Sequence, residues 1–147
     1  MQAVRIHQYG GRERLSIDDI AVPAVAPDEV LVRVVAASVN PVDWKIRAGH
    51  LAQMIAHPLP LTLGWDVSGV VEAVGEAVTE WKVGDAVYSR PDLKRHGTYA
   101  EFVAIRANEC ARKPRTISHV EAASLPLAGI TAWEVLMSTA QVRAGQP

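Results

Sequence analysis

The chain has 147 residues, of which 49% are hydrophobic and 21% are charged, and its formal net charge is −1. This length suits one domain, and the near-neutral charge argues against a nucleic-acid-binding surface. With Cys110 as its one cysteine, the chain cannot form an internal disulfide or a thiolate metal cluster, which favours a cytoplasmic location. There is no signal-peptide pattern, and no apolar run approaches the roughly 20 residues that cross a bilayer. We expect no membrane contact.

The first two-thirds of the chain is rich in β-strand patterns. The stretch 29–37 is dense in β-branched residues and predicts a long, buried strand. Gly69 interrupts an apolar strand, which indicates a bulge or the close approach of another backbone. Short strands this closely spaced favour a small barrel or sandwich. The other expected strands are 3–8, 15–22, 67–75, 86–89, 98–105 and 109–112.

A short helix is expected after the long strand. Asn40 is a favoured N-cap, Pro41 fits the first helical position, and Asp43 complements the helix dipole. This pattern predicts a helix over about 41–48, closed by Gly49. The prolines in the following stretch, 50–62, predict a loop.

Helical patterns replace the β pattern near the carboxyl end. Ser118 and Glu121 form a capping box, which predicts a helix that runs to about residue 124 and is broken by Pro126. A second helix, about 129–139, carries apolar residues at spacings of three and four. We therefore expect a mainly β domain over 1–125 and a helical segment over 126–147. Three tryptophans are expected in the core: Trp44, Trp81 and Trp133.

Three motifs together resemble a known family. They are SVNPVDWK at 38–45, LGWDVSGVVEAV at 63–74 and GDAV at 84–87. The combination resembles the catalytic, GroES-like domain of the medium-chain dehydrogenase/reductase superfamily, in its zinc-independent quinone and enone oxidoreductase branch. The resemblance implies a partly open GroES-like β-barrel followed by helices. It also implies a nucleotide-binding domain beyond residue 147, and the chain itself has no Gly-x-Gly-x-x-Gly phosphate loop.

Zinc is the first cofactor to test, because many members of this superfamily are zinc alcohol dehydrogenases. A catalytic zinc needs about three protein ligands. The resemblance places Asn40, Trp65 and Leu127 at the three ligand positions, and none of them offers a thiolate or an imidazole. The five histidines show no metal-ligand spacing: His7, His50, His57, His96 and His119. We expect no metal.

Asn40 and Lys45 are the candidate catalytic residues. Hydride addition to a conjugated carbonyl builds negative charge on oxygen, which fixed donors must stabilise. The resemblance implies that Asn40 lies beside the nicotinamide and that Lys45 contacts cofactor phosphate or substrate, so both are also candidate cofactor-binding residues. Equally, Asn40 could be a simple helix cap and Lys45 a solvated surface lysine.

Three further residues are candidates for binding. Trp65 could form a wall of the pocket against a planar quinone, or pack in the core. Asp43 could contact substrate, although its place in the first helical turn is explanation enough. Thr131 matches a family threonine whose hydroxyl contacts the nicotinamide, which makes it a candidate cofactor-binding residue.

Two functions of different classes follow. The first is the amino-terminal, substrate-binding part of an NADPH-dependent quinone or enone oxidoreductase, a homo-oligomer acting on small molecules and inactive as this chain alone. In that case most NADPH contacts come from the missing domain, and apolar residues such as Leu125, Leu127, Ile130 and Val135 are left uncovered and promote association. The second is a stand-alone GroES-like interaction module without redox chemistry.

Overall fold

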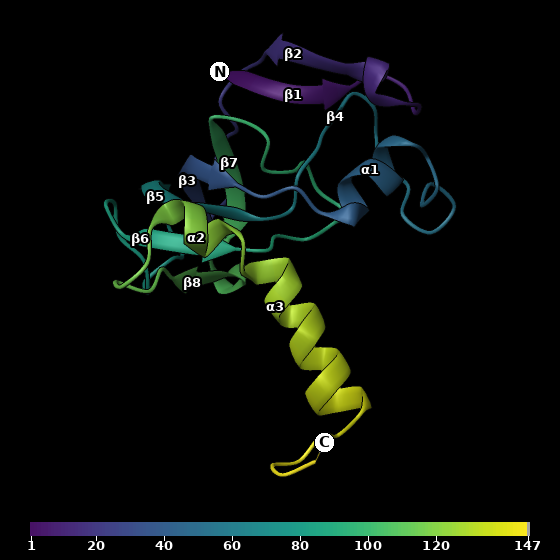
Figure 1. The fold of residues 1–147 in the computed structure, drawn as a ribbon. Helices are drawn as coiled ribbons and strands as arrows, with labels where there is room; N and C mark the ends of the chain where they lie inside the picture. The colour runs from purple at the N-terminus through teal and green to yellow at the C-terminus, as the bar shows by residue number, and fades with distance from the viewer. Residues whose placement is uncertain (147) are drawn as a thin grey trace.

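The computed structural model describes residues 1–146, which form two antiparallel sheets (Figure 1). The smaller sheet has the order β2-β1-β4, and the larger sheet has the order β7-β3-β5-β6-β8. The prediction of a mainly β fold with carboxyl-terminal helices is confirmed. The strands are β1 (Gln2–Ile6), β2 (Leu15–Asp19), β3 (Glu29–Ala37), β4 (Leu61–Thr62), β5 (Val67–Val74), β6 (Ala86–Ser89), β7 (Phe102–Arg106) and β8 (Cys110–Arg112). Short 3₁₀ turns cover Arg12–Arg14 and Ala107–Glu109.

The two sheets are joined where the chain crosses from one to the other. The strand expected over 98–105 begins only at Phe102, because the preceding residues pair with the smaller sheet instead. The Val4 amide donates to the Tyr99 carbonyl at 2.7 Å, and the Tyr99 amide donates to the Leu63 carbonyl at 2.8 Å. Tyr99 is thereby held at the seam between the sheets.

Each sheet covers its own apolar cluster. The larger cluster is built from the valines of β3 and β5 together with Trp81, which is 9% exposed. The smaller cluster surrounds Trp65 and contains Ile6, Ile46, Leu61 and Leu63.

Gly69 fulfils its expected role in the larger sheet. A Cβ there would lie 2.2 Å from the Arg33 carbonyl oxygen, and the pairing of β3 with β5 shifts register beside it. Glycine is required because the neighbouring backbone passes too close for any side chain.

The helices differ in how they pack. Helix α1 (Pro41–Arg47) packs Ile46 into the smaller cluster, and α2 (His119–Ala123) lies on β3, β5 and β6. Helix α3 (Pro126–Trp133) continues as a π-helical segment, Glu134–Thr139, and extends away from both sheets (Figure 1). No helix in the described part of the chain has the length and apolar character to span a bilayer.

Two expectations for the helices were wrong. The last helix was expected to begin near residue 129, but α3 begins at Pro126. Proline fits there because the amide hydrogen that it lacks would have no partner within the first turn of a helix. Trp44 and Trp133 are 45% and 63% exposed rather than buried; all residues from 128 to 146 are exposed, because this part of α3 and its continuation extend away from the sheets (Figure 1). The exposure expected for Leu125, Ile130 and Val135 is confirmed, and Leu127 is half-buried.

Candidate active site

A buried carboxylate, Asp66, lies at the centre of the site. It lies between β4 and β5 and is 0% exposed. Its carboxylate accepts three hydrogen bonds, each from a different part of the chain. Its Oδ2 accepts from Asn40 Nδ2 and from Ser38 Oγ, both at 2.8 Å. Its Oδ1 accepts from the Leu127 amide of α3 at 2.9 Å. Asp66 therefore joins the end of β3, the start of α1 and the start of α3.

A second buried carboxylate holds the same asparagine from its backbone. Asp43 is 3% exposed, and its Oδ2 accepts from the Asn40 amide at 2.6 Å, which completes a capping box at the start of α1. The same oxygen accepts from the Tyr99 hydroxyl at 2.8 Å. Oδ1 of Asp43 is buried with no hydrogen-bond partner in the described part of the chain. Asn40 is thus held at its backbone by Asp43 and at its side chain by Asp66.

Burial governs the ionisation of these groups. It raises the pKa of Asp66 and of Asp43 above the usual range for a carboxyl, although the hydrogen bonds they accept oppose the shift. The pKa of Tyr99 is also raised, chiefly by burial and then by its bond to Asp43. Tyr99 therefore remains a hydrogen-bond donor at every physiological pH.

Local backbone geometry lets Tyr99 reach this site. Gly64 has φ of +91°, and a Cβ there would lie 2.3 Å from the Tyr99 ring. Thr98 Oγ1 donates to the Asp66 carbonyl at 2.8 Å. The residues around Gly64 thus pack against the Tyr99 segment with no room for a side chain between them.

The structure brings together some of the predicted site residues and separates others. Asn40 and Asp43 lie in one network, in which Asp43 accepts from the Asn40 amide and the Tyr99 hydroxyl; a contact of Asp43 with substrate stays a prediction. Lys45 is exposed, with Nζ 5.9 Å from the centroid of the Trp44 ring. Thr131 is exposed on α3, four residues and so about one turn beyond Leu127.

Trp65 takes the core position that the sequence left open. It is 0% exposed and packs within the smaller apolar cluster, with His57 at 5.9 Å between ring centroids. A substrate could reach the indole only by displacing these neighbours.

The residues present do not fit a zinc ion. Of the three positions that the resemblance assigns to zinc ligands, Asn40 and Leu127 meet across Asp66, while Trp65 turns into the core. No group of three or more His, Cys, Asp or Glu side chains within residues 1–146 is arranged to hold a metal.

Sequence reasoning assigned no role to three residues of the network: Ser38, Asp66 and Tyr99. A signal existed for Asp66, because it is the one charged residue in the largely apolar stretch 61–69, all of which the structure buries. A charged side chain that is fully buried requires hydrogen-bond partners. Nothing local marks Tyr99, whose partner Asp43 is 56 residues away.

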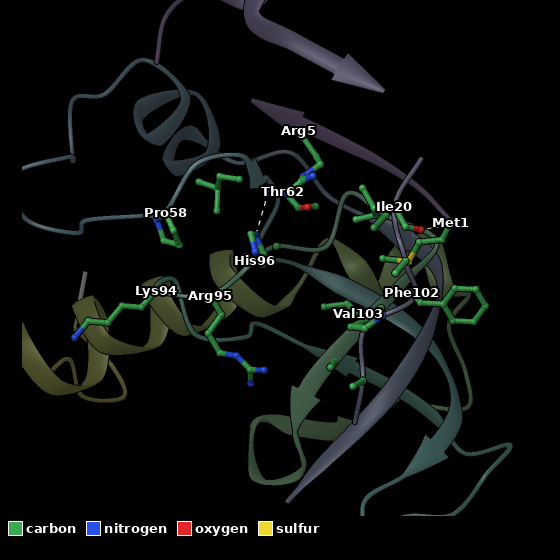
Figure 2. Close-up of a pocket in the computed structure, with 17 residues that line it drawn as sticks. Met1, Arg5, Ile20, Pro58, Thr62, Lys94, Arg95, His96, Phe102 and Val103 are labelled. Carbon is green, nitrogen blue, oxygen red and sulfur yellow. Dashed lines mark hydrogen bonds between the residues drawn. The ribbon is translucent and has the colours of Figure 1, made fainter. Parts of the chain in front are cut away.

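At least two cavities lie outside this network. The larger, about 420 Å³, opens beside the smaller sheet and is lined by residues that include Arg5, His96 and Phe102 (Figure 2). Its arginines already have protein partners: Arg5 donates to the Pro60 carbonyl at 2.7 Å, and Arg95 pairs with Glu29. The second, about 390 Å³, lies between β6 and α3. Asn40, Lys45 and Thr131 line neither cavity.

Comparison with known proteins agrees with this architecture. A model of the alcohol dehydrogenase GroES-like domain matches residues 26–115. The chloroplastic NADPH-dependent alkenal/one oxidoreductase of Arabidopsis thaliana is 42% identical over 146 residues, which cover 95% of this chain and 38% of the relative. The quinone oxidoreductase of Rattus norvegicus is 37% identical over 147 residues, which cover 99% of this chain and 44% of the relative.

Solved structures give the same result. Escherichia coli quinone oxidoreductase complexed with NADPH superposes with a TM-score of 0.86 at 30% identity, covering 95% of this chain and 41% of that one. The chain thus spans less than half the length of the relatives it matches. It belongs to the alcohol dehydrogenase GroES-like domain family, and within the medium-chain dehydrogenase/reductase superfamily it is related to the quinone and alkenal oxidoreductases.

Proposed function

We propose that the chain forms the catalytic-domain part of an NADPH-dependent, zinc-independent reductase that transfers hydride to the conjugated carbonyl of a quinone or enone. The observation that carries the proposal is the doubly held Asn40, fixed by Asp43 at its backbone and by Asp66 at its side chain. The names of the Arabidopsis and rat relatives supply the substrate class.

The exposure of residues on α1 and α3 supports their contact with a bound dinucleotide. NADPH supplies the hydride when it is bound. Asn40 is half-exposed at the junction of the two helices, Lys45 projects from α1 into solvent, and the Thr131 hydroxyl lies about one turn into α3. In this proposal Asn40 and Thr131 contact the nicotinamide end, and Lys45 binds phosphate or stabilises negative charge on the substrate oxygen. A nucleotide-binding domain makes most of the other contacts.

Zinc independence rests on the donor set. The amide of Asn40, the indole of Trp65 and the side chain of Leu127 stand at the positions that would need metal ligands. Asp66, which lies between two of these positions, is already surrounded by hydrogen-bond donors.

A cytoplasmic location and a homo-oligomeric assembly stay predictions. The Arabidopsis relative is chloroplastic, so the family alone does not decide the compartment. The exposed apolar residues of α3, among them Ile130 and Trp133, would favour association of this chain with another surface.

The test is NADPH oxidation with a panel of quinones and enones, using the product of the complete reading frame. Lys45→Met is expected to lower kcat/KM about 100-fold, the usual effect of removing one fixed donor to a developing oxyanion. Thr131→Val should chiefly raise the KM for NADPH. The matched control is Lys82→Met, at an exposed lysine in the turn before β6, which should leave kcat/KM unchanged.

Absence of NADPH oxidation with every acceptor in the panel would reject the reductase and favour the interaction module. Equal losses in Lys45→Met and Lys82→Met would reject the role of Lys45 alone. Residues 1–147 by themselves are expected to give no turnover, so activity from that polypeptide would contradict the need for a second domain.

A further inference from the structure

We propose that Asp66 is a positioning residue of the proposed site: it sets the orientation of the Asn40 amide and fixes the start of α3 relative to it. The inference rests on the proposed function for its catalytic meaning, whereas the geometry it describes can be tested without activity. Asp66 is 0% exposed, so it acts through the groups it binds and not on substrate.

The first step concerns the amide. An ionised carboxylate accepts hydrogen bonds and donates none. Asn40 must therefore turn Nδ2 toward Asp66 Oδ2, because the flipped amide would place Oδ1 against a carboxylate oxygen. Ser38 supports the same orientation, since its hydroxyl donates to Asp66 Oδ2 at 2.8 Å and accepts from Asn40 Nδ2 at 3.1 Å.

The second step concerns the helix. The first amide groups of a helix have no partner within it, and the Leu127 amide of α3 finds one in Asp66 Oδ1 at 2.9 Å. A negative charge at this end of α3 is also favoured by the helix dipole. Since Thr131 lies about one turn further along α3, the same carboxylate determines the spacing between Asn40 and Thr131.

The third step is that one residue makes both contacts. The two oxygens of Asp66 have different partners. Oδ2 accepts hydrogen bonds from the end of β3 and the start of α1, and Oδ1 accepts one from the start of α3. An uncharged amide in its place offers one acceptor oxygen and one donor nitrogen. Asp66→Asn must therefore set a donor against either Asn40 Nδ2 or the Leu127 amide.

The experiment that needs no activity is NMR of the ¹⁵N-labelled protein. The side-chain NH₂ pair of Asn40, assigned by its loss in Asn40→Ala, should move in Asp66→Asn together with the Leu127 amide. The matched control is Ser68→Ala, on β5, which removes a buried hydroxyl bonded to the Val87 carbonyl and His119 but not to Asn40. If Asp66→Asn does not fold, Ser38→Ala should move the same Asn40 pair by a smaller amount. Unchanged Asn40 signals in whichever variant folds would overturn the proposal.

The contribution of Asp66 to catalysis through Asn40 is tested by a double-mutant cycle on kcat/KM with NADPH and a quinone. Asp66→Asn should lower kcat/KM about 10–100-fold, as loss of a supporting group behind a site residue commonly does. In the Asn40→Ala background the same change should cost less than about 2-fold, because the group it orients is gone. Ser68→Ala should cost the same factor in both backgrounds.

Equal effects of Asp66→Asn with and without Asn40 would overturn the positioning role, even in an active reductase. An inactive wild-type protein would instead defeat the proposed function, and the NMR comparison would still decide whether Asp66 orients the amide.

Discussion

The Tyr99 hydroxyl donates a 2.8 Å hydrogen bond to Oδ2 of Asp43, which joins the seam between the sheets to the first turn of α1. Asp43 is 3% exposed and its other oxygen, Oδ1, has no partner within residues 1–146. The Tyr99 hydroxyl is therefore one of two groups that compensate for burying this carboxylate, the other being the Asn40 amide.

Tyr99→Phe should lower the free energy of unfolding by about 1.5–3 kcal/mol, the usual cost of losing a hydrogen bond to a charged group. Urea unfolding at pH 7 measures the change. Tyr88→Phe is the control, because Tyr88 is half-buried on β6 and lies outside the Asp43 network. Equal destabilisation of the two variants would contradict a specific contribution of the Tyr99–Asp43 hydrogen bond.

Two glycines with the same backbone conformation should respond differently to alanine. Gly64 has φ of +91° and Gly84 has φ of +92°, so both substitutions carry the left-handed penalty of about 1–2 kcal/mol. At Gly84 a Cβ meets nothing within 4 Å, whereas at Gly64 it lies 2.3 Å from the Tyr99 ring. Gly64→Ala should therefore destabilise the fold by about 1–3 kcal/mol more than Gly84→Ala does. Thermal unfolding of the two variants compares them, and similar melting temperatures would be the contrary result.

The buried tryptophans should differ in what their indole nitrogens contribute. Trp81 Nε1 donates to the Ala107 carbonyl at 3.0 Å, whereas Trp65 Nε1 is buried without a partner in the described chain. Both replacements by phenylalanine lose volume, but only Trp81→Phe also loses a hydrogen bond and leaves a carbonyl unpaired. Trp81→Phe should cost about 1 kcal/mol more in unfolding free energy than Trp65→Phe. A larger loss for Trp65→Phe would indicate that the unpaired indole has a partner after all.

His119 should make stability depend on pH. Burial, followed by the nearby charges of Lys113 and Arg33, lowers the pKa of His119 below its ordinary value of 6.5. The folded state therefore binds this proton less readily than the unfolded state does, and stability falls as pH drops below 6.5. The imidazole Nδ1 lies 2.8 Å from Ser68 Oγ, so α2 is the element that the change loosens.

The measurement is urea unfolding between pH 7.5 and 5, as the difference between wild type and His119→Asn. The wild type should lose stability relative to the variant as pH falls. Ser68→Ala removes the hydrogen bond but keeps the burial and both cations, so it should retain most of the slope. A difference that is constant across this pH range would contradict the prediction.

Local patterns were sufficient for most of the elements. The N-cap sequence Asn40-Pro41 placed α1 to within a residue, and the capping box of Ser118 and Glu121 placed the start of α2. These predictions succeed because the hydrogen bonds that begin a helix are made within four residues. The strand predicted over 98–105 begins only at Phe102, because Tyr99 pairs instead with segments far away in the sequence. Pairing of that kind leaves no pattern among neighbouring residues.

The candidate site divides in the same way. The sequence by itself determined that Asn40 begins a helix, that the expected zinc ligands are missing, and that glycine is needed at position 69, because each of these depends on residue type and near neighbours. Only the tertiary structure decided that Asp66 lies between Asn40 and Leu127, and that Tyr99 meets Asp43. These contacts join residues 26 to 61 positions apart, and they exist because the fold brings α1, α3 and the seam between the sheets together around two buried carboxylates, Asp66 and Asp43.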